Sequence, residues 1–421
     1  MQAGISKHAL QPIVGSQLMG YGNRENGSDG IHAPIYVRAL ALQQDDVMLV
    51  ICSIEICYLR PPDVRAIQAY VEAHSDLHRD NVLLTTTHTH SAPGAHDDSA
   101  WKTPFVAMVG DTIIEASLRL QPAKMGVGAG FLYGYSINRR WLDRPIDPSV
   151  SVIRVDTING NPLAIIGNYA CHSVVLGYDN LKISGDWSGY ASRLLEAELG
   201  ADCIVMVTQG GAGDINPLTE TVRQRLQAGH PVTSIGELTT YYYDDGTQDD
   251  AWNIEDRAGG TFVECETIAR AYNATLKRVW RTISLIDAPT LSTASLSVSA
   301  MLADDEPPAQ ALPTVLQRFL PDMSQETMAL DIRVIQLGDT IIMTQPGEVF
   351  SETAVNLRKM CQQMGYKHAI SISYANGSYG YLPPENAFAE GGYEVIWALG
   401  LGISRHLQTR IQSAIRDYLH R

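Results

Sequence analysis

The chain has 421 residues, of which 45% are hydrophobic, so it can bury a large core and is not expected to be disordered. Its formal net charge is −15 and its pI is near 5.2. This charge argues against nucleic acid or an anionic membrane surface as a partner, because like charges repel, and it favours a neutral or cationic small-molecule substrate.

Cysteine usage and hydropathy indicate the compartment. The six cysteines are scattered without C-x-x-C spacing, several of them in apolar runs, so we expect reduced core residues. The N-terminus has no basic patch followed by an apolar segment, and no later stretch stays apolar for the roughly 18–20 residues of a membrane span. We therefore expect a cytoplasmic protein without a membrane span.

Apolar runs alternate with helical patterns along the chain, which predicts an α/β fold built as a mixed α+β sandwich. The first half should contain strands over residues 35–42, 47–58, 150–155, 163–169 and 203–207 and a strand within 81–94. It should also contain helices over 61–74 and 106–120, and a helix that the segment 183–190 caps and that runs to about residue 199. The second half should contain helices over 261–280 and 404–419 and strands over 330–337 and 341–344. The second expected strand holds Glu55, a charge that should be paired, face a pocket or point outward.

Residues 81–94 form an apolar run that turns polar at two histidines and ends in a Pro-Gly turn. We interpret the run as a buried strand. Because alternate residues of a strand share a face, His88 and His90 are expected to point the same way, as a zinc ligand and its catalytic neighbour would. The alternative is a pair of surface or hydrogen-bonded histidines at a strand end.

Two further polar elements lie in the middle of the chain. The basic segment 136–140 contains Arg139, which is suited to clamp a substrate carbonyl or carboxylate, or to form a surface ion pair. The apolar strand over 163–169 leads to His172 and so repeats the pattern of the first histidine site. The alternative for His172 is a histidine satisfied by a backbone carbonyl.

A glycine-rich segment, residues 209–217, follows a buried strand and contains Asp214 and Asn216. Its glycines allow the backbone to approach a ligand or metal closely, although a plain turn is the alternative. A phosphate loop is excluded, because no Gly-Lys-Ser/Thr follows. Residues 218–257 then look like an insertion with aromatic side chains among acidic ones, either a lid or a solvated loop.

The C-terminal part adds a carboxylate and a tyrosine-rich loop. Glu348 is expected at the start of a helix that continues through Leu357, where the helix dipole stabilises a carboxylate with or without a metal. Glycines and prolines in the segment 374–394 forbid a long helix or strand, and its tyrosines either donate hydrogen bonds into a pocket or simply pack. With no repeat, low-complexity tract or clear linker, a single domain over 1–421 is the simplest interpretation.

Five motifs occur in the order found in a known family. They are Thr87-His88-Thr89-His90-Ser91-x-Pro93-Gly94, Asn168-Tyr169-Ala170-x-His172, Gly213-Asp214-Ile215-Asn216-Pro217, Pro346-Gly347-Glu348 and the tyrosine-rich loop, preceded by Met19-Gly20-Tyr21 and Gly30-Ile31-His32. Together they resemble the catalytic domain of the neutral/alkaline ceramidase family over nearly the whole chain. The resemblance implies a zinc hydrolase.

The resemblance also implies roles for individual residues. That family binds zinc through two histidines, a glutamate and a tyrosine, which match His88, His172, Glu348 and Tyr381. The other matched positions are the assisting histidine His90, the oxyanion-stabilising tyrosine Tyr393, the substrate-contacting Arg139, and Asp214 and Asn216 of the glycine motif on the substrate side. Two neutral imidazoles and a carboxylate leave zinc a net positive charge, which would activate water for attack on a carbonyl.

Two departures from the family pattern bear on the substrate. Asn216 stands where the glycine motif of the family has serine, and the C-terminal immunoglobulin-like domain and the secretory signal of the family are expected to be missing. We therefore predict that metal binding and hydrolysis are retained, whereas long-chain ceramide is a poor substrate.

Three functions compete at this point. The leading one is a zinc-dependent amide hydrolase acting on a small N-acyl or cyclic molecule. A carboxylic ester or lactone hydrolase would use the same site. The third is a non-enzymatic ligand-binding protein with structural zinc, but structural sites usually have four protein ligands with cysteine common, and the candidate set of His, His, Glu and Tyr favours catalysis.

Overall fold

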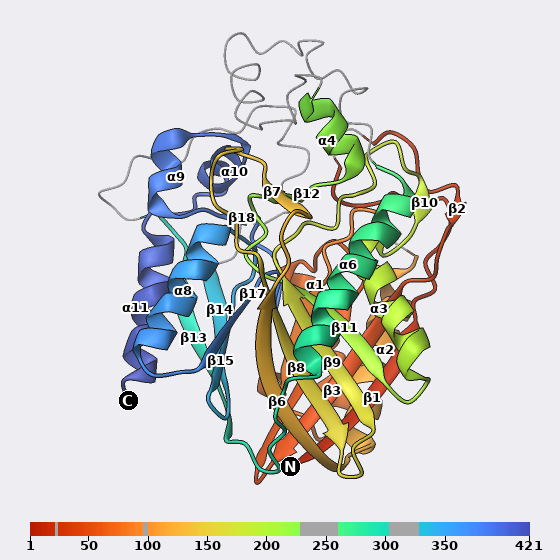
Figure 1. Ribbon diagram of the computed structural model, residues 1–421, viewed down its shortest axis with the longest axis vertical. Coiled ribbons are helices and arrows are strands. Elements are labelled where there is room, and N and C mark those ends of the chain that lie inside the picture. Colours follow the sequence, from red (N-terminus) through yellow and green to blue (C-terminus); the bar gives the residue numbers. More distant parts are fainter. Residues whose placement is uncertain (22–23, 96–99, 228–259, 303–327) are drawn as a thin grey trace.

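The computed structural model describes residues 1–21, 24–95, 100–227, 260–302 and 328–421 (Figure 1). An eight-stranded sheet has the order β11-β9-β8-β6-β1-β3-β4-β5. Only β9–β11 and β4–β5 are parallel pairs. The strands are β1 (Gln2–Ala9), β3 (Tyr36–Gln44), β4 (Val47–Ile54), β5 (Val82–Thr86), β6 (Gln121–Phe131), β8 (Ser149–Thr157), β9 (Pro162–Tyr169) and β11 (Ile204–Gln209).

A second, four-stranded sheet has the order β13-β14-β15-β17, with β15 and β17 parallel. Its strands are β13 (Leu291–Ser299), β14 (Ala329–Leu337), β15 (Thr340–Thr344) and β17 (His368–Ile372). Three two-stranded pairs complete the strands: β2 (Gly30–Ile31) with β10 (Lys182–Ile183), β7 (Ser136–Asn138) with β12 (Ile215–Pro217), and β16 (Glu348–Val349) with β18 (Tyr381–Leu382).

Helices lie beside the two sheets and beyond their upper ends in Figure 1. They are α1 (Pro61–His74), α2 (Lys102–Leu118), α3 (Asp186–Leu199), α4 (Glu220–Gln227), α6 (Phe262–Trp280), α8 (Ser351–Gln363), α9 (Glu385–Glu390), α10 (Tyr393–Gly400) and α11 (Leu407–Leu419), with a short 3-10 turn, η1 (Arg79–Asn81). In Figure 1, α8 and α11 flank the four-stranded sheet on one side, and α3 and α6 lie across the large sheet on the other.

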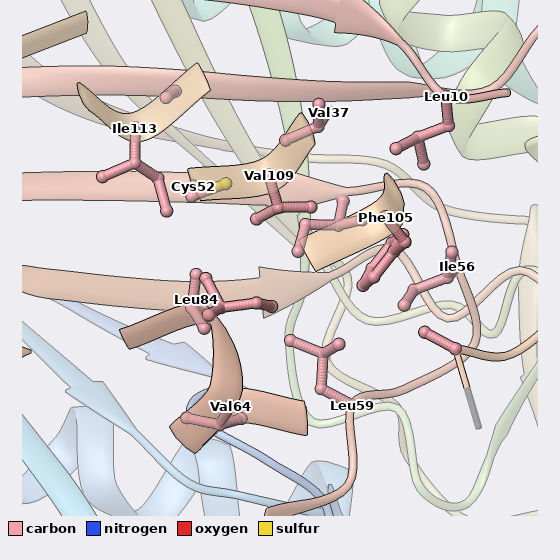
Figure 2. Packing of buried hydrophobic residues seen from close by; sticks show 14 of the residues in the cluster. Leu10, Val37, Cys52, Ile56, Leu59, Val64, Leu84, Phe105, Val109 and Ile113 are labelled. Carbon is pink, nitrogen blue, oxygen red and sulfur yellow. The ribbon is translucent and has the colours of Figure 1, made fainter. Parts of the chain in front are cut away.

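Strand alternation explains the layers. Along β3, Val37, Ala39 and Ala41 pack with α1 and α2, whereas Leu40 and Leu42 enter a second cluster. That second cluster also contains Ile335 and Ile342 of the four-stranded sheet, so the two sheets pack face to face. The predicted mixed α+β sandwich is confirmed. Figure 2 shows part of the first cluster, with side chains from β3, β4, β5, α1 and α2 in contact.

The large sheet is curled, so its two edge regions approach each other. Strand β11 lies in contact with β3, β4 and β5 as well as with its partner β9. The hydroxyl of Ser53 on β4 donates to the carbonyl of Val207 on β11 at 3.0 Å. The side-chain amide of Gln209 donates to the carbonyl of Thr87, just past β5, at 3.0 Å. The carboxyl ends of β5, β9 and β11 therefore meet at one place.

Several predictions about single residues can be compared with the structure. All six cysteines are buried free thiols, as expected. Glu55 is 1% exposed and forms an ion pair with Arg38 at 2.5 Å, and Arg38 also pairs with Glu196 at 2.7 Å, so the paired alternative holds. Within the described residues, no helix combines the length and apolar character that crossing a bilayer requires.

The expected helix start at Glu348 is wrong. Glu348 lies in the short strand β16, where it pairs with Tyr381 of β18, and α8 begins three residues later at Ser351. The sequence Gln345-Pro346-Gly347 makes a turn after β15, and the amide of Glu348 then bonds to the carbonyl of Gly380 at 2.8 Å. This pairing, rather than a helix dipole, fixes the backbone of the carboxylate.

Candidate metal centre

Three segments that follow strands bring the first candidate ligands together. His88 follows β5, His172 follows β9 and Glu348 follows β15. The two histidine segments run side by side, because Thr89 and Ser173 form a parallel bridge and the hydroxyl of Ser173 donates to the carbonyl of Thr87 at 2.9 Å. The short strands β7, β12 and β18, which lie together in the upper middle of Figure 1, border the same region.

The ligand atoms of these residues converge. Nε2 of His172 lies 3.1 Å, and Nε2 of His88 3.7 Å, from Oε2 of Glu348. Both imidazole side chains are buried, at 2% exposure or less, and the Glu348 side chain is 12% exposed. Donors about 2.0–2.2 Å from a tetrahedral ion stand about 3.3–3.6 Å apart, so the observed spacing suits a metal ligand set.

Backbone carbonyls fix which ring nitrogen faces the cluster. Nδ1 of His88 donates to the carbonyl of Cys57 at 2.9 Å, and Nδ1 of His172 donates to the carbonyl of Ile215 at 3.1 Å. Each Nε2 is then left with its lone pair, which faces the carboxylate. Metal-binding histidines typically have this arrangement, with the other ring nitrogen bonded to a carbonyl or carboxylate.

Electrostatics make the cluster suited to a cation. Burial lowers the pKa of His88 and of His172 to about 3, so both rings are neutral at neutral pH. Burial also raises the pKa of Glu348. Two nitrogen lone pairs and a carboxylate within 4.8 Å of one another repel unless a proton or a cation lies between them. The donor set therefore fits a divalent metal ion.

His90 lies beside this cluster, although not for the reason expected. Strand β5 ends at Thr86, and His88 adopts a left-handed backbone with φ of 60°, so strand alternation does not orient the two rings. Nevertheless, Nε2 of His90 is 3.1 Å from Nε2 of His88. Both Nε2 atoms therefore face the same centre, and Nδ1 of His90 is buried without a partner among the described residues.

The early glycine loop holds His90 in place. Gly20 has φ of 99°, and a Cβ there would stand 2.2 Å from Cγ of His90. The Tyr21 ring meets the His90 ring edge-on, with centroids 4.8 Å apart. The guanidinium of Arg24 donates to the carbonyl of His90 at 3.0 Å. The early glycine loop, which includes the motif Met19-Gly20-Tyr21, is thus in direct contact with His90.

Arg139 connects the two tyrosine-bearing elements. Its guanidinium donates to the hydroxyl of Tyr381 at 3.0 Å, to Glu394 at 3.0 Å and to Oδ1 of Asn216 at 3.4 Å. Although burial opposes its charge, Tyr381 and Glu394 raise the pKa of Arg139 above its ordinary value. Arg139 is therefore a buried permanent cation beside the centre, and the surface ion pair considered for it is not formed.

Asp214 has internal partners for its carboxylate. One oxygen accepts from the side-chain amide of Asn138 and the other from the backbone amide of Ser351, both at 2.8 Å. Burial raises the pKa of Asp214 to about 6. These contacts tie β7 to α8 and so hold Arg139 in position, while direct contact of Asp214 with a substrate stays a prediction.

Tyr381 and Tyr393 both border the centre. Tyr381 is paired with Glu348 across β16 and β18, and its hydroxyl accepts from Arg139 at 3.0 Å. Tyr393 is the first residue of α10, and its ring lies edge-on to that of Tyr381 with centroids 5.7 Å apart. Burial raises the pKa of Tyr393 to about 12, so its hydroxyl keeps its proton and can donate. The structure thus brings all nine sequence-predicted residues into one region.

Two residues that the sequence did not single out belong to the same region. The ring of Tyr374 stacks on His88, and Glu394, which is fully buried, bonds both Arg139 and Arg140. Tyr374 was one of several tyrosines in an irregular loop. For Glu394 the only signal was an unexplained charge within the apolar sequence of α10. Residues 228–257 of the expected insertion lie outside the described residues, and residues 220–227 form α4.

Replacing Glu394 by glutamine is expected to lower the free energy of unfolding by about 3–5 kcal/mol, because two buried guanidinium groups lose their counter-charge. Its carboxylate is 3.0 Å from Arg139 and 2.6 Å from Arg140. Urea denaturation measures the loss. Glu390→Gln is the matched control, since Glu390 also binds Arg140 but is partly exposed, and it should cost about 1 kcal/mol or less. Equal losses would refute this account of Glu394.

Comparisons with known proteins identify the family of the chain. Residues 4–240, more than half of the chain, match the model of the family described as neutral/alkaline non-lysosomal ceramidase, N-terminal. Neutral ceramidase B of Dictyostelium discoideum is 29% identical over 246 residues, 48% of this chain. The neutral ceramidase of Mycobacterium tuberculosis is 24% identical over 240 residues, also 48% of this chain. The matches span 33% and 37% of the lengths of these two relatives.

Solved structures show the same fold over nearly the whole chain. A structure described as ceramidase complexed with C2 superposes with a TM-score of 0.78 and 18% identity. The neutral ceramidase of Pseudomonas aeruginosa gives a TM-score of 0.76, again with 18% identity. Both comparisons cover 99% of this chain and 74% of the solved one. The fold of the solved ceramidases therefore extends beyond residue 240 to Glu348 and the tyrosine-bearing loop.

Proposed function

Since the chain belongs to the neutral/alkaline non-lysosomal ceramidase family, we propose that it is a zinc-dependent hydrolase that cleaves the amide bond of a small N-acyl or cyclic substrate. The observation that supports this most strongly is the convergence of two neutral imidazoles and a carboxylate, each imidazole oriented by a backbone carbonyl. The proposed zinc ligands are His88, His172, Glu348 and Tyr381. Tyr381 would complete the set from β18, directly across from Glu348.

The chemistry can be divided among these groups. Zinc supplies a Lewis acid that lowers the pKa of water towards neutrality. His90, with Nε2 directed at the centre and a pKa lowered by burial, is neutral and suited to take up a proton and deliver it to the leaving nitrogen. Tyr393 and Arg139 are further candidate donors, which would stabilise the oxyanion that forms from the carbonyl.

Asn216 and Asp214 would form the substrate side of the centre. Asn216 is partly exposed and accepts from Arg139, so its amide can bond a polar group of the substrate while Arg139 is held in place. Asp214 acts through the contacts that fix the loop of Arg139. We further propose that residues 1–421 work as one catalytic domain in which 218–257 are an inserted loop or lid, although 228–257 lie outside the described residues. The cytoplasmic location stays a prediction.

Short N-acyl amides are expected to be hydrolysed faster than long-chain ceramide, because Asn216 replaces the serine of the family motif. The measurement is kcat/KM for an N-acyl series of increasing chain length, with the zinc-loaded chain and with protein stripped by chelator. Turnover of long-chain ceramide above that of the short amides would show that this substrate assignment is wrong.

The same assay separates the competing functions. A matched pair of amide and ester with the same acyl and leaving groups shows which bond is preferred. Hydrolysis of the ester or of a lactone alone would replace the amide assignment. Stoichiometric zinc without turnover of any of these compounds would instead favour a binding protein, and absence of zinc from the purified chain would refute the proposed centre.

A further inference from the structure

Tyr374 touches each of the three residues whose ligand atoms converge. Its ring stacks on that of His88, with centroids 4.0 Å apart and an interplanar angle of 17°. Its hydroxyl donates to Oε2 of Glu348 at 3.3 Å. It also meets the ring of His172 edge-on, with centroids 6.5 Å apart. Tyr374 is 1% exposed, so its side chain is held among these three residues and does not sample other positions at the surface.

The backbone places Tyr374 there at some cost. Its φ is 54°, in the left-handed region that a residue with a Cβ rarely adopts, and Asn376 has the same value. Hydrogen bonds on both sides hold this conformation. The amide of Tyr374 donates to the carbonyl of Gly347 at 3.1 Å, and Asn376 exchanges bonds of 2.8 and 2.9 Å with Leu84 of β5.

These bonds attach the loop of Tyr374 to the segment of Glu348 and to the strand that leads to His88. Gly347 immediately precedes Glu348, and Leu84 lies four residues before His88. A non-glycine residue is kept in a strained conformation only where its surroundings enforce it, and such sites are concentrated where geometry matters for function. The strained backbone conformation thus places the Tyr374 side chain against the centre.

We propose that Tyr374 is a positioning residue of the metal centre, in which its ring sets the plane of the His88 imidazole and its hydroxyl orients the Glu348 carboxylate. This inference rests on the proposed function, because it presumes that these two residues bind zinc. A phenol is protonated at neutral pH, so the hydroxyl is a donor towards the carboxylate. The carboxylate then keeps a defined rotation, and the ring of His88 cannot turn away from the carbonyl of Cys57.

Two substitutions separate the two contributions. Tyr374→Phe keeps the stacked ring and removes the donor, whereas Tyr374→Leu removes both. Partners that orient metal ligands typically contribute 10–100-fold to metal affinity. We expect zinc affinity to fall about 10-fold in Tyr374→Phe and towards 100-fold in Tyr374→Leu, as measured on the full chain by competition with a chelator.

The control is Tyr272→Phe, another buried tyrosine, which lies in α6 among core side chains and has no partner for its hydroxyl among the described residues. It should bind zinc as the parent does. The visible spectrum of the cobalt(II)-loaded protein is a second readout, because its bands respond to ligand geometry and would shift in the Tyr374 variants only. Thermal unfolding verifies that each variant folds. If Tyr374→Leu does not fold, Tyr374→Phe still tests the role of the hydroxyl.

Zinc affinity within twofold of the parent in both Tyr374 variants, with unchanged cobalt spectra, would overturn the inference and leave the proposed function standing. A loss in Tyr374→Leu alone would support the role of the ring and overturn that of the hydroxyl. If the parent chain itself binds no stoichiometric zinc, the proposed function fails, and the inference fails with it. Zinc binding by the parent thus tests the proposed function, and the Tyr374 variants test the positioning role.

Discussion

His88→Ala and His172→Ala should each abolish stoichiometric zinc binding and reduce turnover to the background rate. Each ring supplies one of only two nitrogen donors, and each is held by a bond to a backbone carbonyl that alanine cannot make. A ligand set reduced to one imidazole, a carboxylate and a phenol binds zinc weakly. Elemental analysis after gel filtration should show about one zinc per chain for the parent and a small fraction of that for either variant.

The control for this experiment is His74→Ala. His74 is exposed at the end of α1, where its ring bonds the carbonyl of Tyr70. Its replacement should leave zinc content and rate unchanged. Full metal occupancy in both His88→Ala and His172→Ala would remove the metal centre from the account of this protein.

Tyr393→Phe should retain zinc and fold yet lose about 10²–10³-fold in kcat, because an oxyanion donor acts mainly in the transition state. The ring of Tyr393 lies beside that of Tyr381, whereas Tyr381 itself pairs with Glu348 across β16 and β18 and its hydroxyl accepts from Arg139. Tyr381→Phe should therefore weaken zinc retention as well as rate. Steady-state kinetics and zinc content of the same preparations measure both effects.

The two tyrosine variants control for each other, since each removes one hydroxyl from one of two neighbouring rings. If Tyr393→Phe turned over substrate like the parent, or lost its metal, the roles given to the two tyrosines could not stand. A rate loss in Tyr381→Phe with zinc fully retained would exchange their roles.

The sequence was informative where chemistry changes abruptly along the chain. His88 and His172 stand where an apolar strand turns polar, and burial on both faces makes the strands themselves continuous apolar runs. The helix over residues 262–280 was predictable from the capping box of Thr261 and Glu264 and from its amphipathic pattern. Such features are local, so they need no knowledge of the fold.

Other features depend on contacts between distant segments. Arg139 and Glu394 are 255 positions apart, so the sequence around either residue does not predict their ion pair. Glu348 was expected in a helix because its pairing with Tyr381 is not visible in local sequence. Tyr374 owes its place to a left-handed backbone that its residue type does not favour, which is a case of tertiary structure overriding local preference.

The wide separation of the candidate ligands along the chain has a consequence for when the centre can form during synthesis. His172 and Glu348 are separated by 176 positions, and the segment matched by the family model ends at residue 240, before the carboxylate has been synthesised. A nascent chain that has emerged only that far holds both imidazoles but not Glu348 or Tyr381. Contacts of such long sequence separation form slowly, because the entropy of closing the loop must be overcome first. Metal uptake should therefore be among the last events of maturation, and metal retention would report completed folding of the whole chain.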